Sequence, residues 1–286
     1  MGPLSSLPSA TIFGDVMSAI TSSLQSGPFG IPALLSVTWS VVLPLTLYKK
    51  VYGIGVAYGF SVFWAGWTML QVLAPGPLSS PLSAGMCLAA ACMFYGVRLG
   101  GYLLLRDATR KPQLPSSIKN GSIPSRVTFS LSLALFYAFL TTPTLFALRE
   151  PSTSTIAWLG TGIAWVGALL EAIADLQKYL VKQAHKDDAD TSKFIGPTSF
   201  AYRISRHPNY LGEVLFWIGV FMGGLPSFGT SISAWICSIL GVTGITSIML
   251  KATDGLEKRQ TEKYGGQEAY DTWRKEVTSS LIPFIK

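Results

Sequence analysis

The segment from Thr155 to Leu176 reads TIAWLGTGIAWVGALLEAIADL, and its first ionisable side chain is that of Glu171. A run of about 20 mainly apolar residues is long enough to cross the hydrocarbon core of a bilayer as a helix. The two acids of the segment, Glu171 and Asp175, are four residues apart and therefore share one helix face. We predict a transmembrane helix whose acidic pair needs a cation, a proton or hydrogen-bond donors between its charges.

Six other apolar runs lie on both sides of this segment. Only 13% of the 286 residues are charged, whereas a soluble domain carries about a quarter. We therefore predict an all-α, polytopic bundle of about seven transmembrane helices. The expected spans are Ile31–Tyr48, Ile54–Ala74, Ala84–Leu105, Val127–Leu148, Thr155–Leu176, Leu211–Gly224 and Ser231–Leu250.

Lysines and arginines are concentrated on one side of this predicted bundle. Of the 22, all except Arg98 and Arg149 fall in the four segments that seven spans would place together, 49–53, 106–126, 177–210 and 251–286. The positive-inside rule makes that side cytosolic, so we expect a cytosolic C-terminus and an N-terminus that is lumenal or outside. This distribution accounts for the net charge of +7 without a nucleic-acid partner.

Two further features limit the choices. Residues 1–30 are rich in Ser, Gly and Pro, and without a basic flank before their apolar residues they predict a flexible leader and no cleaved signal peptide. The three cysteines, Cys87, Cys92 and Cys237, all lie in apolar runs. Their spacing predicts neither a disulfide framework nor a metal site.

The stretch before the sixth span reads Ser205-Arg-His-Pro-Asn-Tyr-Leu-Gly-Glu213. Pro208 suits the first turn of a helix, where its missing N–H costs no hydrogen bond. The unpaired amides of that turn, with Arg206 and His207 beside them, predict an anion site. Gly212 allows another backbone or a flat ring to approach closely. From residue types alone, a structural helix start is an equal alternative.

This stretch resembles the signature of the steroid 5-alpha-reductase C-terminal-domain family and of its relatives, the isoprenylcysteine carboxyl methyltransferases. The likeness covers Val166 to Lys286 and includes the segments Glu171–Lys178, Gly255–Arg259, Lys263–Gly266 and Leu281–Phe284. It divides the chain into the leader 1–30, substrate-side helices 31–165 and a cofactor-side domain 166–286.

The resemblance implies a membrane oxidoreductase that transfers hydride from NADPH to a conjugated carbon–carbon double bond in a sterol-like or isoprenoid-like lipid. Acids and amides can hold ribose hydroxyls or a carboxamide, while Lys and Arg bind phosphates. No Gly-x-Gly-x-x-Gly motif follows a strand, so a Rossmann domain is not expected. By position, the resemblance assigns cofactor binding to Glu171, Asp175, Lys182, Arg206, His207, Asn209, Tyr210, Glu213, Arg259 and Tyr270.

The third span supplies the catalytic candidates. The segment Phe94–Tyr102 resembles the reductase segment that holds a catalytic tyrosine, which corresponds to Tyr95, with Arg98 on the same helix face. Such a phenol could donate a proton as hydride adds to the double bond. The family's steroid enzymes pair it with an earlier glutamate, but the second span here offers only Gln71. Packing for Tyr95 and snorkelling for Arg98 are the structural alternatives.

Two other functions stay open. An S-adenosylmethionine-dependent methyltransferase would share the Arg-His-Pro-x-Tyr core, and a non-catalytic protein could retain the same helices. The tail segment Leu256–Arg259 lacks the adjacent glutamates typical of the methyltransferase branch, which favours the reductase. The expected partners are a lipid-like substrate and the bilayer, in the endoplasmic reticulum if the source is eukaryotic. The sequence does not determine the oligomeric state.

Overall fold

The computed structural model describes residues 9–25, 30–74, 82–109, 121–185, 190 and 192–283. All regular structure within these ranges is helical. The elements are α1 (Ser9–Gln25), α2 (Gly30–Tyr48), α3 (Lys50–Ile54), α4 (Val56–Leu73), α5 (Ala84–Thr109), α6 (Ile123–Arg149), α7 (Thr155–Ala184), η3 (Phe200–Arg203), α8 (Pro208–Gly224), η4 (Leu225–Ser227), α9 (Ile232–Tyr264) and α10 (Glu268–Glu276).

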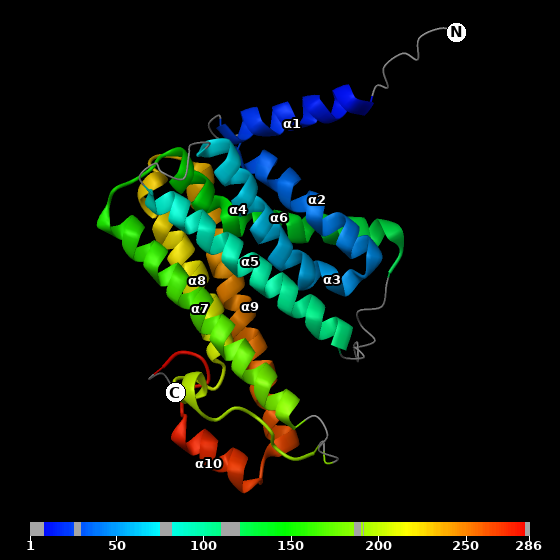
Figure 1. The fold of residues 1–286 in the computed structure, drawn as a ribbon, viewed down its shortest axis with the longest axis vertical. Helices are drawn as coiled ribbons and strands as arrows, with labels where there is room; N and C mark the ends of the chain where they lie inside the picture. The colour runs from blue at the N-terminus through cyan, green and yellow to red at the C-terminus, as the bar shows by residue number, and fades with distance from the viewer. Residues whose placement is uncertain are drawn as a thin grey trace.

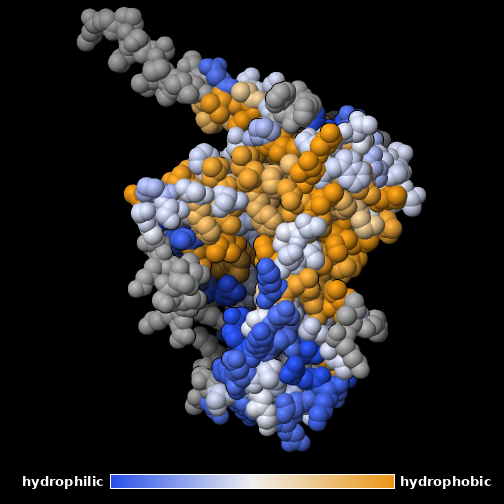
Figure 2. Space-filling view, turned by 180° about the vertical axis from the view of Figure 1, so that it is seen from behind, coloured by the Kyte–Doolittle hydropathy of each residue, from blue (hydrophilic) through white to orange (hydrophobic). Residues whose placement is uncertain are grey.

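Seven of these helices, α2 and α4–α9, are long and apolar enough to cross a membrane. The predicted all-α, seven-span bundle is therefore confirmed, while its orientation stays a prediction. On the face that Figure 2 shows, apolar residues cover most of the upper part of the molecule, and polar residues cover the lower part, where Figure 1 places α10. We call the end of the bundle where α5, α7 and α9 finish and α8 begins the charged end, and the opposite end the far end.

Several helices continue past the predicted spans at the charged end. Helix α7 runs to Ala184 and α9 to Tyr264, both well beyond their apolar stretches. The C-terminal part of α9 leads into α10 outside the apolar surface (Figures 1 and 2). An apolar cluster that includes Phe194, Tyr202, Tyr270 and Trp273 packs here and holds this extension in place. Apolar run length alone cannot reveal an extension stabilised by contacts of this kind.

The leader also differs from its prediction as a flexible segment. Residues Ser9–Gln25 form α1, which lies across the far end of the bundle (Figure 1). The Gln25 side chain donates to the Val72 carbonyl at 3.4 Å. Helix formation here satisfies the backbone, and contacts with α2 and α4 anchor the segment.

Helices α7 and α8 pack backbone against backbone. A Cβ atom at Gly212 would lie 2.6 Å from the backbone nitrogen of Glu171, and one at Gly219 would lie 2.2 Å from that of Ala164. The close approach predicted at Gly212 is therefore made by the backbone of α7. Small residues allow such contact between membrane helices, because no side chain separates the two backbones. As a result, acids from both helices reach the same space.

Candidate functional site

A cavity of about 230 Å³ opens between α5, α7 and α8 at the charged end. Six of the predicted cofactor residues line it, namely Glu171, Asp175, Lys182, Asn209, Tyr210 and Glu213. Helix α5 contributes Leu99, Tyr102, Leu103 and Arg106 to the opposite wall, and α7 adds Lys178 and Tyr179. The structure thus brings together residues that are more than 100 positions apart in the sequence.

The Arg98 guanidinium lies between the two acids of α7. Its Nη2 atom is 2.8 Å from Glu171 Oε1, and its Nη1 atom is 2.9 Å from Asp175 Oδ2. The Asn209 side chain then donates to Asp175 Oδ1 at 3.3 Å. This arrangement supplies the cation that the acidic pair requires, so Arg98 turns into the bundle instead of reaching for the membrane surface. We call Arg98, Glu171, Asp175 and Asn209 the cavity cluster.

The cavity cluster does not use all of its hydrogen-bonding atoms. Among the described residues, Arg98 Nε and Glu171 Oε2 are buried and have no hydrogen-bond partner. Most buried polar atoms in folded proteins are paired with protein or ordered water. Because Glu171 lines the cavity, its unsatisfied oxygen indicates a place where a polar ligand or water completes the network.

A second hydrogen-bond network joins the catalytic candidate Tyr95 to this cavity through a residue that the sequence did not single out. Tyr95 Oη donates to Tyr58 Oη at 3.1 Å, and Tyr58 Oη donates to Glu213 Oε1 at 3.0 Å. Trp217 Nε1 also donates to Tyr58 Oη, at 2.5 Å. The tyrosine hydroxyl thereby uses its one donor and both acceptor positions. Glu213 is the member of this network that lines the cavity.

Tyr95 itself is enclosed. Its side chain is fully buried, and its ring stacks on Phe216 with centroids 4.1 Å apart. The Arg98 guanidinium lies over the Tyr95 ring, 5.4 Å from its centroid. Tyr95 thus contacts Tyr58 and does not line the cavity, whereas Glu213 can contact a ligand there.

The outer part of the cavity is cationic. Arg106 and Lys182 are exposed, Lys178 is half-buried, and all three line the opening, while Glu171, Asp175 and Glu213 are buried deeper. Cations at the opening with acids and an amide inside suit a ligand with phosphates at one end and hydroxyl or carboxamide groups at the other. The volume is below the range of about 300–1,000 Å³ typical of drug-sized ligands. The cavity can therefore enclose only part of a ligand as large as a dinucleotide.

Arg206 and His207, both predicted to bind cofactor, do not line this cavity. Arg206 Nε and Nη2 lie 3.0 and 2.9 Å from the carboxylate of Glu257, and Nη1 donates to the carbonyls of Val277 and Thr278. His207 Nε2 lies 2.7 Å from the same carboxylate. The predicted anion site therefore exists, but its anion is an internal glutamate from α9.

These contacts tie the start of α8 to the C-terminal segment. Arg274 joins the same carboxylate at 3.2 Å, and the backbone nitrogens of Arg206 and His207 donate to the carbonyls of Ser279 and Ser280. We call Arg206, His207, Glu257 and Arg274 the tail cluster. Its position indicates a structural role in holding α8, α9 and the C-terminal segment together.

Three other candidates also lie outside the cavity. Gln71 is exposed near the far end of α4, roughly 20 Å along the helix from Tyr58, so it cannot pair with Tyr95. Tyr270 is buried in the apolar cluster at the charged end, with its ring 5.1 Å from that of Phe194. Arg259 is exposed on α9 and does not line the cavity.

Sequence reasoning missed Tyr58 and the structural role of Glu257. A tyrosine in the apolar run of the second span was the feature that could have pointed to this residue. The structure places Tyr58, unlike Gln71, on the buried face of α4. No group of three or more His, Cys, Asp or Glu side chains in the described part of the chain is arranged to hold a metal ion.

A family model described as a protein of unknown function (DUF1295) matches residues 56–277. This range includes six of the seven long helices, the cavity cluster and the tail cluster. No curated protein and no solved structure matches the chain.

Proposed function

The chain belongs to the DUF1295 family, and for it we propose a membrane-embedded oxidoreductase that reduces a conjugated carbon–carbon double bond of a lipid with NADPH. The observation that supports this most is the cavity between α5, α7 and α8, in which buried acids and an amide face a cationic opening. The resemblance of residues 166–286 to the steroid 5-alpha-reductase C-terminal-domain family supplies the reaction class.

Different residues of the cavity would bind different groups of NADPH. Asn209 and Asp175 offer an amide and a carboxylate for ribose hydroxyls or a carboxamide, and the unsatisfied Glu171 Oε2 can accept a further hydrogen bond. Arg106, Lys178 and Lys182 lie where phosphates would leave the cavity. NADPH supplies the hydride when bound. The lipid would approach from the membrane past Leu99 and Leu103 of α5, which form the apolar wall.

We assign Glu213 the role of proton donor to the substrate. Reduction of a double bond adds hydride to one carbon and a proton to the other, so a donor must reach the cavity. Tyr58 holds Glu213 Oε1 by donating to it. This contact leaves Oε2 as the oxygen that can carry the proton to the substrate and regain one from water at the cavity opening. Tyr95 and Trp217 act indirectly, since both orient Tyr58.

Ligand preference tests this proposal. Purified protein would be titrated with NADPH while nicotinamide fluorescence is followed, and S-adenosylmethionine would be compared with it by thermal shift. We expect saturable NADPH binding with a rise in melting temperature. Stabilisation by S-adenosylmethionine alone would replace the reductase with a methyltransferase, and stabilisation by neither would favour a non-catalytic protein.

A further inference from the structure

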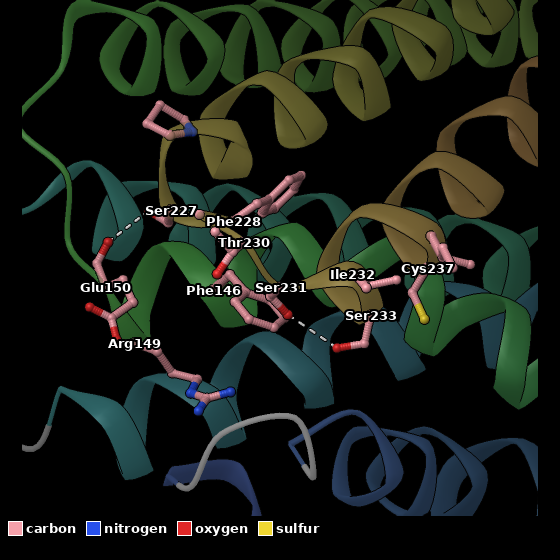
Figure 3. Close-up of a pocket in the computed structure, with 13 residues that line it drawn as sticks. Phe146, Arg149, Glu150, Ser227, Phe228, Thr230, Ser231, Ile232, Ser233 and Cys237 are labelled. Carbon is pink, nitrogen blue, oxygen red and sulfur yellow. Dashed lines mark hydrogen bonds between the residues drawn. The ribbon is translucent and has the colours of Figure 1, made fainter.

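A second and larger hollow lies at the far end of the bundle. It has a volume of about 1,060 Å³ and is formed by the end of α6, the loop that follows α8 and the start of α9 (Figure 3). Helix α8 separates it from the cavity cluster by roughly 25 Å, its length at 1.5 Å per residue. No step of the proposed reduction uses this hollow.

One base and one acid line this hollow, Arg149 and Glu150. They are adjacent in the chain, and in Figure 3 the Arg149 guanidinium extends away from the Glu150 carboxylate. The Arg149 guanidinium lies over the ring of Phe146, 5.3 Å from its centroid. The Ser227 hydroxyl donates a hydrogen bond to the backbone carbonyl of Glu150, and this bond does not involve the Glu150 carboxylate.

The rest of the lining combines hydroxyls and apolar side chains. Thr230, Ser231 and Ser233 provide hydroxyls, and Phe146, Phe228, Ile232 and Ile236 provide apolar surface. Ile232 and Ile236 are also 74% and 53% exposed, so the apolar lining continues onto the outer surface of α9. The hollow therefore has a polar part at the helix ends and an apolar part that is continuous with the exposed face of α9.

A bilayer crossed by α6 and α9 would have its headgroup region at this hollow, because α6 ends and α9 begins there. Arg149 stands on the side of the bundle that is otherwise depleted of lysine and arginine. An arginine binds a phosphate through two parallel hydrogen bonds, and a carboxylate accepts hydrogen bonds from a primary ammonium. One wall thus presents partners for both charges of a zwitterionic headgroup.

We propose that this hollow binds one glycerophospholipid of the phosphoethanolamine type. Arg149 binds its phosphate, Glu150 accepts hydrogen bonds from its primary ammonium, and an acyl chain lies along Ile232 and Ile236. A quaternary choline headgroup has no N–H to donate to Glu150, and a glycerol headgroup has no positive charge. Both of these lipids should therefore bind more weakly.

The test uses the full chain, purified in detergent and observed by native mass spectrometry. Phosphatidylethanolamine, phosphatidylcholine and phosphatidylglycerol with identical acyl chains would be titrated separately, together with free phosphoethanolamine. We expect phosphatidylethanolamine to bind about tenfold more tightly than the other two lipids, the loss expected for one hydrogen bond to a charged group. Free phosphoethanolamine should bind much more weakly, because it lacks the acyl chain.

Two variants and two matched controls complete the experiment. Arg149→Gln and Glu150→Gln should each reduce binding of phosphatidylethanolamine to the level of phosphatidylcholine. Arg203→Gln and Glu276→Gln make the same changes at exposed positions of the charged end and should leave it unaltered. Equal binding of the three lipids, a preference for phosphatidylglycerol, or an unchanged Glu150→Gln variant would overturn the proposal. Glu150→Gln decides the matter even if Arg149→Gln does not fold.

Discussion

The two buried charge clusters beside the start of α8 differ in how completely they satisfy their hydrogen bonds. In the tail cluster, Arg206 donates hydrogen bonds to the Glu257 carboxylate and to two backbone carbonyls. The same carboxylate also contacts the side chains of His207 and Arg274. In the cavity cluster, Arg98 has two acidic partners, yet Arg98 Nε and Glu171 Oε2 are buried without a hydrogen-bond partner among the described residues.

This difference separates a structural role from a binding role. Residue types alone make the clusters look alike, since each combines arginine with glutamate near the same helix start. A cluster whose atoms are all paired within the protein has nothing left to offer a ligand. A buried cluster with unpaired atoms beside a cavity is one that a ligand can complete.

The largest effect should come from breaking the tail cluster. Arg206→Ala would leave the half-buried carboxylate of Glu257 and two backbone carbonyls without their main donor. Removing one member of a buried ion pair costs about 3–5 kcal/mol, a large part of a typical folding free energy. We expect a greatly lowered melting temperature, measured by thermal unfolding of the purified protein. Arg203→Ala, an exposed arginine three positions earlier, is the control.

An Arg206→Ala protein that melts like the wild type but no longer binds NADPH would show that Arg206 is a ligand contact. The distinction between the clusters would then fail.

A smaller effect should follow from changing the network behind the cavity. Tyr58→Phe removes the donor to Glu213 Oε1, and a hydrogen bond to a charged group is worth about 1.5–3 kcal/mol. We expect turnover to fall roughly 10- to 100-fold while NADPH affinity is retained, measured with the enone lipid that the wild-type protein reduces.

Tyr137→Phe is the matched control for that variant. Tyr137 stacks on Tyr58 with centroids 5.0 Å apart, but its hydroxyl donates to the Gly53 carbonyl and not to Glu213. Both substitutions remove one buried phenol oxygen from the same region. Equal losses of turnover in the two variants would mean that packing, not the position of Glu213, is responsible.

The smallest effect should come from the cavity opening. Lys182 lines the cavity and Arg259 does not, although both were predicted to bind cofactor. An ion pair between exposed charges contributes about 0–1 kcal/mol, so Lys182→Gln should weaken NADPH binding by less than roughly fivefold. The effect should disappear at high salt. Arg259→Gln should not change NADPH affinity. If a fluorescence titration shows a larger loss of affinity for Arg259→Gln than for Lys182→Gln, the phosphate site lies on α9 instead.

The sequence predicts the membrane bundle well because the hydrocarbon core requires long apolar helices, and seven such runs are visible. It predicts the ends of α7 and α9 poorly. The extension of α9 ends in Tyr264, whose ring packs on those of Phe194 and Tyr270, and these contacts form only in the folded protein. Likewise, the spacing of Glu171 and Asp175 predicts a shared face and a need for compensating charge. That the compensating cation is Arg98 follows only from the packing of α5 against α7.

The same limit applies to the signature region. The composition of residues 205–213 predicts an anion site, and an anion is present. Local sequence cannot tell whether that anion is a ligand or Glu257, which lies about 50 positions later. Tyr58 was overlooked for a related reason, since only the tertiary structure shows that its hydroxyl meets Glu213.

Thermal unfolding of Asn209→Ala, with and without NADPH, tests the distinction between the two clusters most directly. Asn209 makes one hydrogen bond to Asp175 and is half-buried, so its removal should change the melting temperature of the ligand-free protein only slightly. NADPH should raise the melting temperature of the wild type, whereas in the variant an affinity lowered about tenfold should remove most of that rise at limiting ligand. An undiminished rise in Asn209→Ala would contradict the assignment of the cavity cluster to cofactor binding.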